Sequence, residues 1–206
     1  MFTESPLARF AAYEIERHLP PQFLAGTIKA QTDHGAFGRF ERGEIDLEHF
    51  DDAFLRETTD AGHPVSGREL MSLLSLQLRP AMAEAHQRLI GAGFKTACIT
   101  NNTPGSTAAE WVGNDDKGAV ARVMDSFDAV IESATVGMRK PEPAIYRLAC
   151  ERLSVDPHEC VFLDDLGVNL KPAKAMGMQT IKVPLDHWQA ALIELERVTG
   201  TELLTP

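Results

Sequence analysis

Residues 160–169 read CVFLDDLGVN, an apolar run followed directly by two carboxylates and then a glycine. A continuous apolar run bounded by turn residues is typical of a buried parallel strand, and ligands of open α/β sheets bind beyond the carboxyl ends of such strands. Asp164 and Asp165 repel each other there unless a cation or a proton relieves them. The stretch predicts half of a Mg²⁺ site, although an isolated acid pair more often caps the helix that follows it.

Helical and strand patterns alternate from about residue 80 onward, with short Gly or Pro punctuation between them. We expect helices at 80–90, about 106–124, 141–153 and from Lys171-Pro172 to Gly177. A last helix is expected near the end of the chain, where Asp186 and Gln189 would form a capping pair. Strands are expected at 94–99, 127–131, 160–163 and 179–183. Such alternation predicts an α/β core with a doubly wound parallel sheet. Gly91-Ala92-Gly93 is no dinucleotide fingerprint, because it precedes a strand instead of following one.

The first 79 residues show helical periodicity without a buried strand. The helical segments are expected at 7–18, 23–30, 47–56 and 68–76, with a loop at Gly35–Gly43. The chain therefore divides into a helical module, residues 1–79, and an α/β core, residues 80–206.

Composition narrows the classes of function. The 206 residues carry a formal net charge of -10, which argues against nucleic acid as a partner because backbone binding needs clustered Lys and Arg. No apolar stretch approaches the roughly 20 residues of a spanning helix, and the first six residues lack the pattern of a signal peptide, so we expect no membrane partner and a cytoplasmic location. Cys98, Cys150 and Cys160 fit buried thiols in a reducing compartment, and the scattered histidines give no zinc spacing.

Three expected strand ends carry polar residues. Thr100 and Asn101 follow the first of these strands, Lys140 stands in the segment GMRKP at 137–141, and the third strand ends in the acid pair, with Asn169 four residues further on. Each group alone has an ordinary structural explanation, such as a helix cap or a solvated surface lysine. A Thr, a Lys and an acid pair in this order after parallel strands are far more specific together.

These motifs resemble the haloacid dehalogenase superfamily, in the branch that includes the amino-terminal phosphatase domain of soluble epoxide hydrolase and the amino-terminal domain of acyl-CoA dehydrogenase family member ten. The resemblance is carried by residues 99–101, 136–143, 161–174 and 198–204 and covers nearly the whole chain. It implies a Rossmann-like sheet with an α-helical cap.

The resemblance also implies roles for the residues at the strand ends. Thr100 would bind the transferring phosphoryl group with the help of Asn101, and Lys140 would neutralise the charge of the nucleophile and the phosphate. Asp165 would be the direct Mg²⁺ ligand and Asp164 would support it. Asn169 would orient their loop.

The family's nucleophile, an Asp that ends the first strand, is missing from this sequence. Residues 1–6 resemble the stretch just downstream of that motif, so we expect a truncated sequence, most simply from a start codon chosen too late. In this fold the first strand lies between the strands that bear Thr100 and Asp165. Its absence predicts a gap there, flanked by two unpaired strand edges.

The leading functional expectation is a Mg²⁺-dependent phosphatase for a small phosphorylated metabolite or a lipid-like phosphate, working through an aspartyl-phosphate. The chain as written would be inactive or nearly so, which leaves its status as an enzyme open. One alternative is a 2-haloacid dehalogenase, which attacks carbon and needs no metal. The other is a noncatalytic binding or regulatory protein of the same fold. Substrate choice would depend on residues around 35–42, and the oligomeric state stays open.

Overall fold

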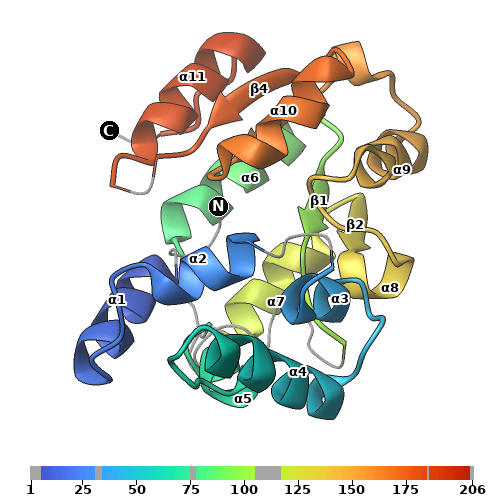
Figure 1. Cartoon of the computed structure of the whole chain (residues 1–206). Coiled ribbons are helices and arrows are strands. Elements are labelled where there is room, and N and C mark those ends of the chain that lie inside the picture. The colour runs from blue at the N-terminus through green and yellow to red at the C-terminus, as the bar shows by residue number, and fades with distance from the viewer. Residues whose placement is uncertain (1–5, 31–33, 75–77, 105–116, 185, 205–206) are drawn as a thin grey trace.

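The computed structural model describes residues 6–30, 34–74, 78–104, 117–184 and 186–204 (Figure 1). The helices before residue 75 are α1 (Leu7–Glu16), α2 (Phe23–Ala30), α3 (Ala36–Glu41), α4 (Leu47–Asp60) and α5 (Gly67–Ser72). The later helices are α6 (Pro80–Gly91), α7 (Lys117–Asp125), α8 (Ser133–Val136), α9 (Pro143–Leu153), the 3₁₀ turn η2 (Pro157–Glu159), α10 (Gly167–Ala175) and α11 (Gln189–Thr199). The strands are β1 (Ala97–Thr100), β2 (Ala129–Glu132), β3 (Val161–Asp164) and β4 (Gln179–Lys182).

The four strands form two parallel pairs. β1 pairs with β2, with Thr100 opposite Glu132, and β3 pairs with β4, with Asp164 opposite Lys182. Parallel strands joined by helices confirm the predicted α/β core. Because the strands of each pair are parallel, their carboxyl ends lie at the same edge.

The two pairs are not joined to each other by any described strand. Within the described ranges, β1 and β3 each have a partner on one edge only. The expected gap is therefore present between them. The gap also explains why residues 97–100 and 161–163 are only half-buried. The full burial that their apolar sequence predicts is therefore wrong.

Helices pack on both faces of the strands. Val161 and Leu163 of β3 pack with α6 and α11 in one hydrophobic cluster, whereas Phe162 packs with α9 and α10 in another. Figure 1 shows α10 and α11 on either side of β4, with α9 next to β1 and β2. This alternation of neighbouring side chains between two layers is the packing expected of a doubly wound sheet.

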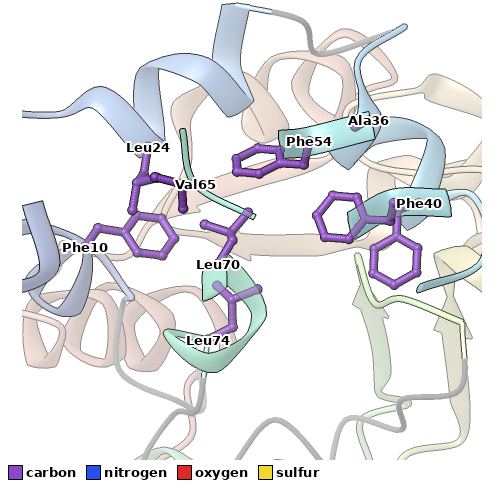
Figure 2. Packing of buried hydrophobic residues seen from close by; sticks show 9 residues of the cluster. Phe10, Leu24, Ala36, Phe40, Phe54, Val65, Leu70 and Leu74 are labelled. Carbon is purple, nitrogen blue, oxygen red and sulfur yellow. The ribbon is translucent and has the colours of Figure 1, made fainter. Parts of the chain in front are cut away.

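The helices before residue 75 have a hydrophobic cluster of their own (Figure 2). Phe40 of α3 stacks on Phe50 of α4 at a centroid distance of 4.4 Å, and Phe54 packs beside them. The other buried members of the cluster are Phe10, Leu24, Ala36, Val65, Leu70 and Leu74. The helical character of this segment is as predicted, while the boundary at residue 79 stays a prediction.

Three local predictions were wrong. The expected loop at 35–43 contains α3, which forms because the apolar side chains of Ala36 and Phe40 are buried against α4. α10 begins at Gly167, four residues before Lys171, and keeps Pro172 inside it.

The third wrong prediction is the capping pair of the last helix. α11 begins at Gln189 after Trp188, and no side chain caps its first turn. Of the expected helix at 106–124, residues 106–116 lie outside the described part of the chain, and the remainder belongs to α7. Residues 75–76, at the end of the helix expected at 68–76, also lie outside the described part of the chain, and α5 is the helix observed in this segment.

Candidate active site

Five of the six predicted site residues line one cavity of about 720 Å³ between the two strand pairs, which we call the inter-sheet slot; the sixth, Asn169, is not among its lining residues. All four residues of β1 and all four residues of β3 line it. Thr100, Asn101, Lys140 and Asp165 also lie on its wall, at the end where β1 and β3 finish. The structure thus brings the three predicted strand-end groups together.

The rest of the wall is mainly apolar. Helices from both faces of the sheet contribute Met82 and Leu89 of α6, Val123 of α7, Ala149 of α9 and Leu192 of α11. On the side of the first five helices, Phe37, Leu74 and Leu78 line the cavity. The slot is therefore a largely apolar space along β1 and β3. The predicted polar groups lie at the carboxyl ends of these strands, and Lys95, Thr96 and Glu159 lie at their amino ends.

Asp164 is buried, with 4 % of its surface exposed, and its carboxylate is fully engaged. Oδ2 accepts a hydrogen bond from Lys140 Nζ at 2.9 Å. Oδ1 accepts one from the Leu166 amide at 2.8 Å and one from Asn169 Nδ2 at 2.9 Å. The capping alternative is wrong for this pair, because α10 has Leu166 at its N-cap and no side chain caps it.

Asp165 is half-buried and lines the slot, and among the described residues its carboxylate has no hydrogen-bond or ion-pair partner. Carboxylate oxygens are donors that suit Mg²⁺, which usually keeps several waters and takes only one or two carboxylates from the protein. The described residues place no group of three His, Cys, Asp or Glu side chains together, so a closed all-protein metal site is not present in them. The donor set fits a partly hydrated Mg²⁺ with Asp165 as its ligand.

Lys140 is held in place from two sides. Its ammonium is paired with Asp164, and its backbone is clamped by Asn101, whose Oδ1 accepts from the Lys140 amide at 2.8 Å while Nδ2 donates to the Lys140 carbonyl at 3.0 Å. The end of β1 thus fixes the loop that carries the lysine. Asn101 is an anchor of this loop, and its contribution to substrate binding stays a prediction.

Asn169 connects the acid pair to α9. Its side chain donates to Asp164, and its backbone carbonyl accepts a hydrogen bond from the Tyr146 hydroxyl at 2.8 Å. Tyr146 is fully buried, and burial raises the pKa of its hydroxyl, which therefore stays protonated as a donor. This geometry is that of a residue that orients the loop.

Two residues at the site were missed by the sequence reasoning. Arg139 precedes Lys140, and its Nε and Nη2 lie 2.7 and 2.5 Å from one carboxylate oxygen of Glu41, at the end of α3. Both side chains are at least nine-tenths buried. The pair fixes α3 on the loop of Lys140. The position of Arg139 next to Lys140 could have indicated a role for it at the site. No such signal marked Glu41, which lies in the segment predicted as a loop.

Two further contacts hold α3 on the core. Arg42 lies 3.5 Å from Glu142. Gly43 has φ of +70°, and a Cβ there would approach the Ala134 carbonyl oxygen of α8 to 2.7 Å, so only glycine fits without displacement. The first helices and the core are therefore in close backbone contact beside the site.

The three cysteines are free thiols. Cys150 is buried, whereas Cys98 and Cys160 are half-buried because they lie at the slot, which corrects the expectation of three buried thiols. Burial raises the pKa of all three thiols, that of Cys160 to about 12. Protonated thiols are poor nucleophiles, so the structure gives no support to cysteine chemistry.

Comparison with known proteins gives one family. A family model of haloacid dehalogenase-like hydrolases matches residues 3–177. Acyl-CoA dehydrogenase family member 10 of Mus musculus is 36 % identical over 97 % of this chain and 18 % of its own length. Bifunctional epoxide hydrolase 2 of the same organism is 35 % identical over 89 % of this chain and 34 % of its own length. The chain thus spans about a fifth to a third of these relatives.

Solved structures agree at the level of the fold. A haloacid dehalogenase-family enzyme of Bacteroides thetaiotaomicron, crystallised with magnesium and inorganic phosphate, covers 86 % of this chain with a TM-score of 0.54 and 22 % identity, and 82 % of its own chain is matched.

Proposed function

Because this chain belongs to the haloacid dehalogenase-like hydrolases, we propose that its slot carries the phosphate-holding and metal-holding part of a phosphatase site. The reaction is Mg²⁺-dependent hydrolysis of a phosphate monoester through an aspartyl-phosphate. The observation that carries the proposal is the meeting of Thr100, Lys140 and Asp165 at one end of the slot.

The charges at this end fit phosphoryl transfer. That reaction asks the protein mainly for positioning and for stabilisation of negative charge. Lys140 supplies a cation whose backbone and side chain are both fixed, and Thr100 supplies a hydroxyl that has no partner among the described residues. Both can hydrogen-bond phosphoryl oxygens.

Asp165 would hold the Mg²⁺, and Asp164 would fix its loop and Lys140. When bound, the metal supplies charge neutralisation for the phosphoryl group. The Bacteroides thetaiotaomicron enzyme of the same fold was crystallised with magnesium and inorganic phosphate together, which supports this choice of cofactor.

The substrate would be a small phosphorylated metabolite or a lipid-like phosphate. Phe37, Leu74 and Leu78 line the cavity from the side of the helical segment, which favours an apolar group on the substrate. We also propose a reducing, cytoplasmic location, consistent with the three free thiols. No described helix is both long and apolar enough to cross a bilayer.

The chain of 206 residues is expected to turn over phosphate esters slowly or not at all. Within the described ranges, no strand lies between β1 and β3, and no aspartate ends such a strand to serve as nucleophile. The residues that would bind the phosphate and the metal are thus among the described residues, whereas the nucleophilic aspartate that they would assist is not.

The test is a variant in which an apolar strand ending in Asp-x-Asp precedes Met1. We expect it to release phosphate from an aryl phosphate, with activity abolished by EDTA and by Asp165→Asn. The matched control carries Asn in place of the first added Asp. Metal-independent halide release from a 2-haloacid, without phosphatase activity, would identify a dehalogenase. Ligand binding without any turnover would identify a noncatalytic protein.

A further inference from the structure

Two consecutive charged residues at the end of α3 meet two charged residues of the loop that carries Lys140. Glu41, the last residue of α3, places one carboxylate oxygen 2.7 Å from Nε and 2.5 Å from Nη2 of Arg139. The next residue, Arg42, lies 3.5 Å from Glu142. The order of the signs is reversed, because α3 presents a negative and then a positive charge to a loop that presents a positive and then a negative one. We call these four residues the charge clamp.

The charge clamp holds the chain on both sides of Lys140. Arg139 directly precedes the lysine and Glu142 follows it by two residues. These two residues also close the loop on itself, because the Glu142 amide donates to the Arg139 carbonyl at 2.8 Å and Oε2 of Glu142 accepts from the Arg139 amide at 3.4 Å. Asn101 holds the backbone of the lysine from the end of β1. The position of Lys140 is therefore set from β1 and from α3 at once.

Stability alone does not account for the buried half of the clamp. The side chains of Glu41 and Arg139 are only 7 % and 8 % exposed. Removing both charges from water costs free energy that their attraction must repay, and an apolar pair of similar volume is often as stable in such a place. A buried ion pair can add a single register, because each charge is compensated only by its own partner. The pair therefore fixes where α3 lies on the loop.

The charge of Lys140 is useful to an anion only in the right place. Its ammonium is a compact point charge with three N–H donors. One of them donates to Asp164 at 2.9 Å, which leaves two donors for phosphoryl oxygens beside Thr100. A displacement of about 1 Å, caused far from the reacting atoms, can cost about 10²-fold in rate. The position of the loop therefore bears on phosphate binding as well as on the fold.

We propose that Glu41 and Arg139 are positioning residues for Lys140, so that an anion binds tightly at the lysine only while α3 is docked on the loop. Arg42 and Glu142 support the same docking. All four residues act through the lysine, and this role rests on the proposed function, in which Lys140 binds the phosphoryl group. Because coupling between two sites is reciprocal, a phosphate bound at the lysine must favour the docking of α3 by the same factor.

The first test is calorimetric titration of the 206-residue chain with inorganic phosphate in the presence of Mg²⁺. The double variant Glu41→Leu with Arg139→Met removes the buried pair and keeps the net charge, so the long-range attraction for the anion is unchanged. We expect its dissociation constant for phosphate to rise at least tenfold, while its midpoint of urea denaturation stays near that of the unaltered chain. The matched control, Glu194→Leu with Arg197→Met, makes the same exchange at an exposed pair on α11 and should leave the affinity unchanged.

A milder variant keeps the test decisive if the double variant does not fold. Glu41→Asp keeps both charges and shortens the reach toward Arg139 by one methylene group. We expect it to raise the dissociation constant for phosphate at least threefold. A displaced charge pair would thus weaken phosphate binding without the loss of either charge.

Hydrogen exchange followed by NMR tests the reciprocal effect without any change to the protein. The amides of Arg42 and Gly43 donate to the Gly38 and Phe40 carbonyls at the end of α3. With phosphate bound, both amides should exchange at least threefold more slowly, while amides of α11 keep their rates.

Each outcome bears on one of two claims. Unchanged phosphate affinity in a folded double variant, or in Glu41→Asp, overturns the positioning role. Equal loss of affinity in the α11 control, or phosphate binding that leaves the amides of Arg42 and Gly43 unaffected, overturns it as well. In all these cases the unaltered chain binds phosphate and the proposed function stands. If the unaltered chain binds no phosphate, the proposed function fails and the positioning role fails with it.

Discussion

Glu41 and Arg139 lie 98 residues apart in the sequence and form a buried ion pair beside Lys140. The pair joins a helix of the first segment to the loop that carries the candidate phosphate-binding lysine. Removal of one partner leaves an uncompensated charge in a buried site, which is the costly way to break such a pair.

We predict that Glu41→Gln lowers the free energy of unfolding by about 3–5 kcal/mol, as measured by urea denaturation. The double variant Glu41→Leu with Arg139→Met removes both charges and should recover most of this loss. Arg197→Ala breaks an exposed ion pair and serves as the control, with no change in the denaturation midpoint. If the double variant were as unstable as Glu41→Gln, the loss in the single variant would not come from a buried charge left without its partner.

The adjacent acids Asp164 and Asp165 should respond differently to substitution. Mg²⁺ at ten times its dissociation constant should stabilise the chain by about 1.4 kcal/mol. Asp165→Asn should lose most of this effect and keep the stability without metal, because its carboxylate has no partner among the described residues.

Asp164→Asn should instead lower the stability without metal by about 3 kcal/mol, because Lys140 loses its buried partner. Thermal unfolding with Mg²⁺ and with EDTA separates the two effects, and exposed Asp186→Asn is the control. A reversed pattern would exchange the roles assigned to the two acids.

Gly43→Ala tests the close approach of the first segment to α8. Its φ of +70° costs an L-residue about 1–2 kcal/mol, and the new Cβ would also meet the Ala134 carbonyl oxygen. Gly26→Ala, where a Cβ meets nothing within 4 Å, is the matched control and should be neutral or slightly stabilising. Chemical denaturation measures both; equal effects would show that the contact at Gly43 yields readily.

His86 should make the stability depend on pH. Burial lowers its pKa below 6.5, while the nearby Asp128 raises it in part, and its ring stacks on Phe127 between the hydroxyls of Thr96 and Ser126. The unfolded state then binds more protons between the folded pKa and 6.5, so the stabilisation is complete above about pH 6.5 and is lost as the pH falls through the folded pKa. Urea denaturation from about pH 5 to 8 should show this loss, and His86→Gln should flatten that part of the profile. An unchanged slope in the variant would assign the dependence to other groups.

The core of the fold was predictable because its information is local. The apolar run before Asp164 and the alternation of helices and strands after residue 80 identify parallel strands and the edge where polar residues gather. The resemblance of three short motifs then placed Thr100, Lys140 and Asp165 at one site, and the structure brings these residues to one cavity.

Features that depend on distant contacts were not predictable in the same way. α3 forms because Phe40 stacks on Phe50, and the glycine and arginine around it carry no helical signal of their own. Glu41, the partner of Arg139, lies on that same helix. The wrong prediction of a loop at 35–43 therefore also concealed the ion pair between them. The half-burial of β1 and β3 likewise depends on what faces them across the slot.

The divided sheet also bears on how the molecule opens. In an undivided sheet, one ladder of backbone hydrogen bonds runs from edge to edge, so the strands lose their order together. Here the ladder stops at β1 and resumes at β3, and described side-chain contacts such as Tyr146 to Asn169 and Lys140 to Asp164 bridge the two halves. The two ladders are thus joined only through side chains, by these polar contacts and by the apolar cluster that Ile99 of β1 and Ile131 of β2 share with Phe162 of β3, and their amides should report two distinct opening free energies.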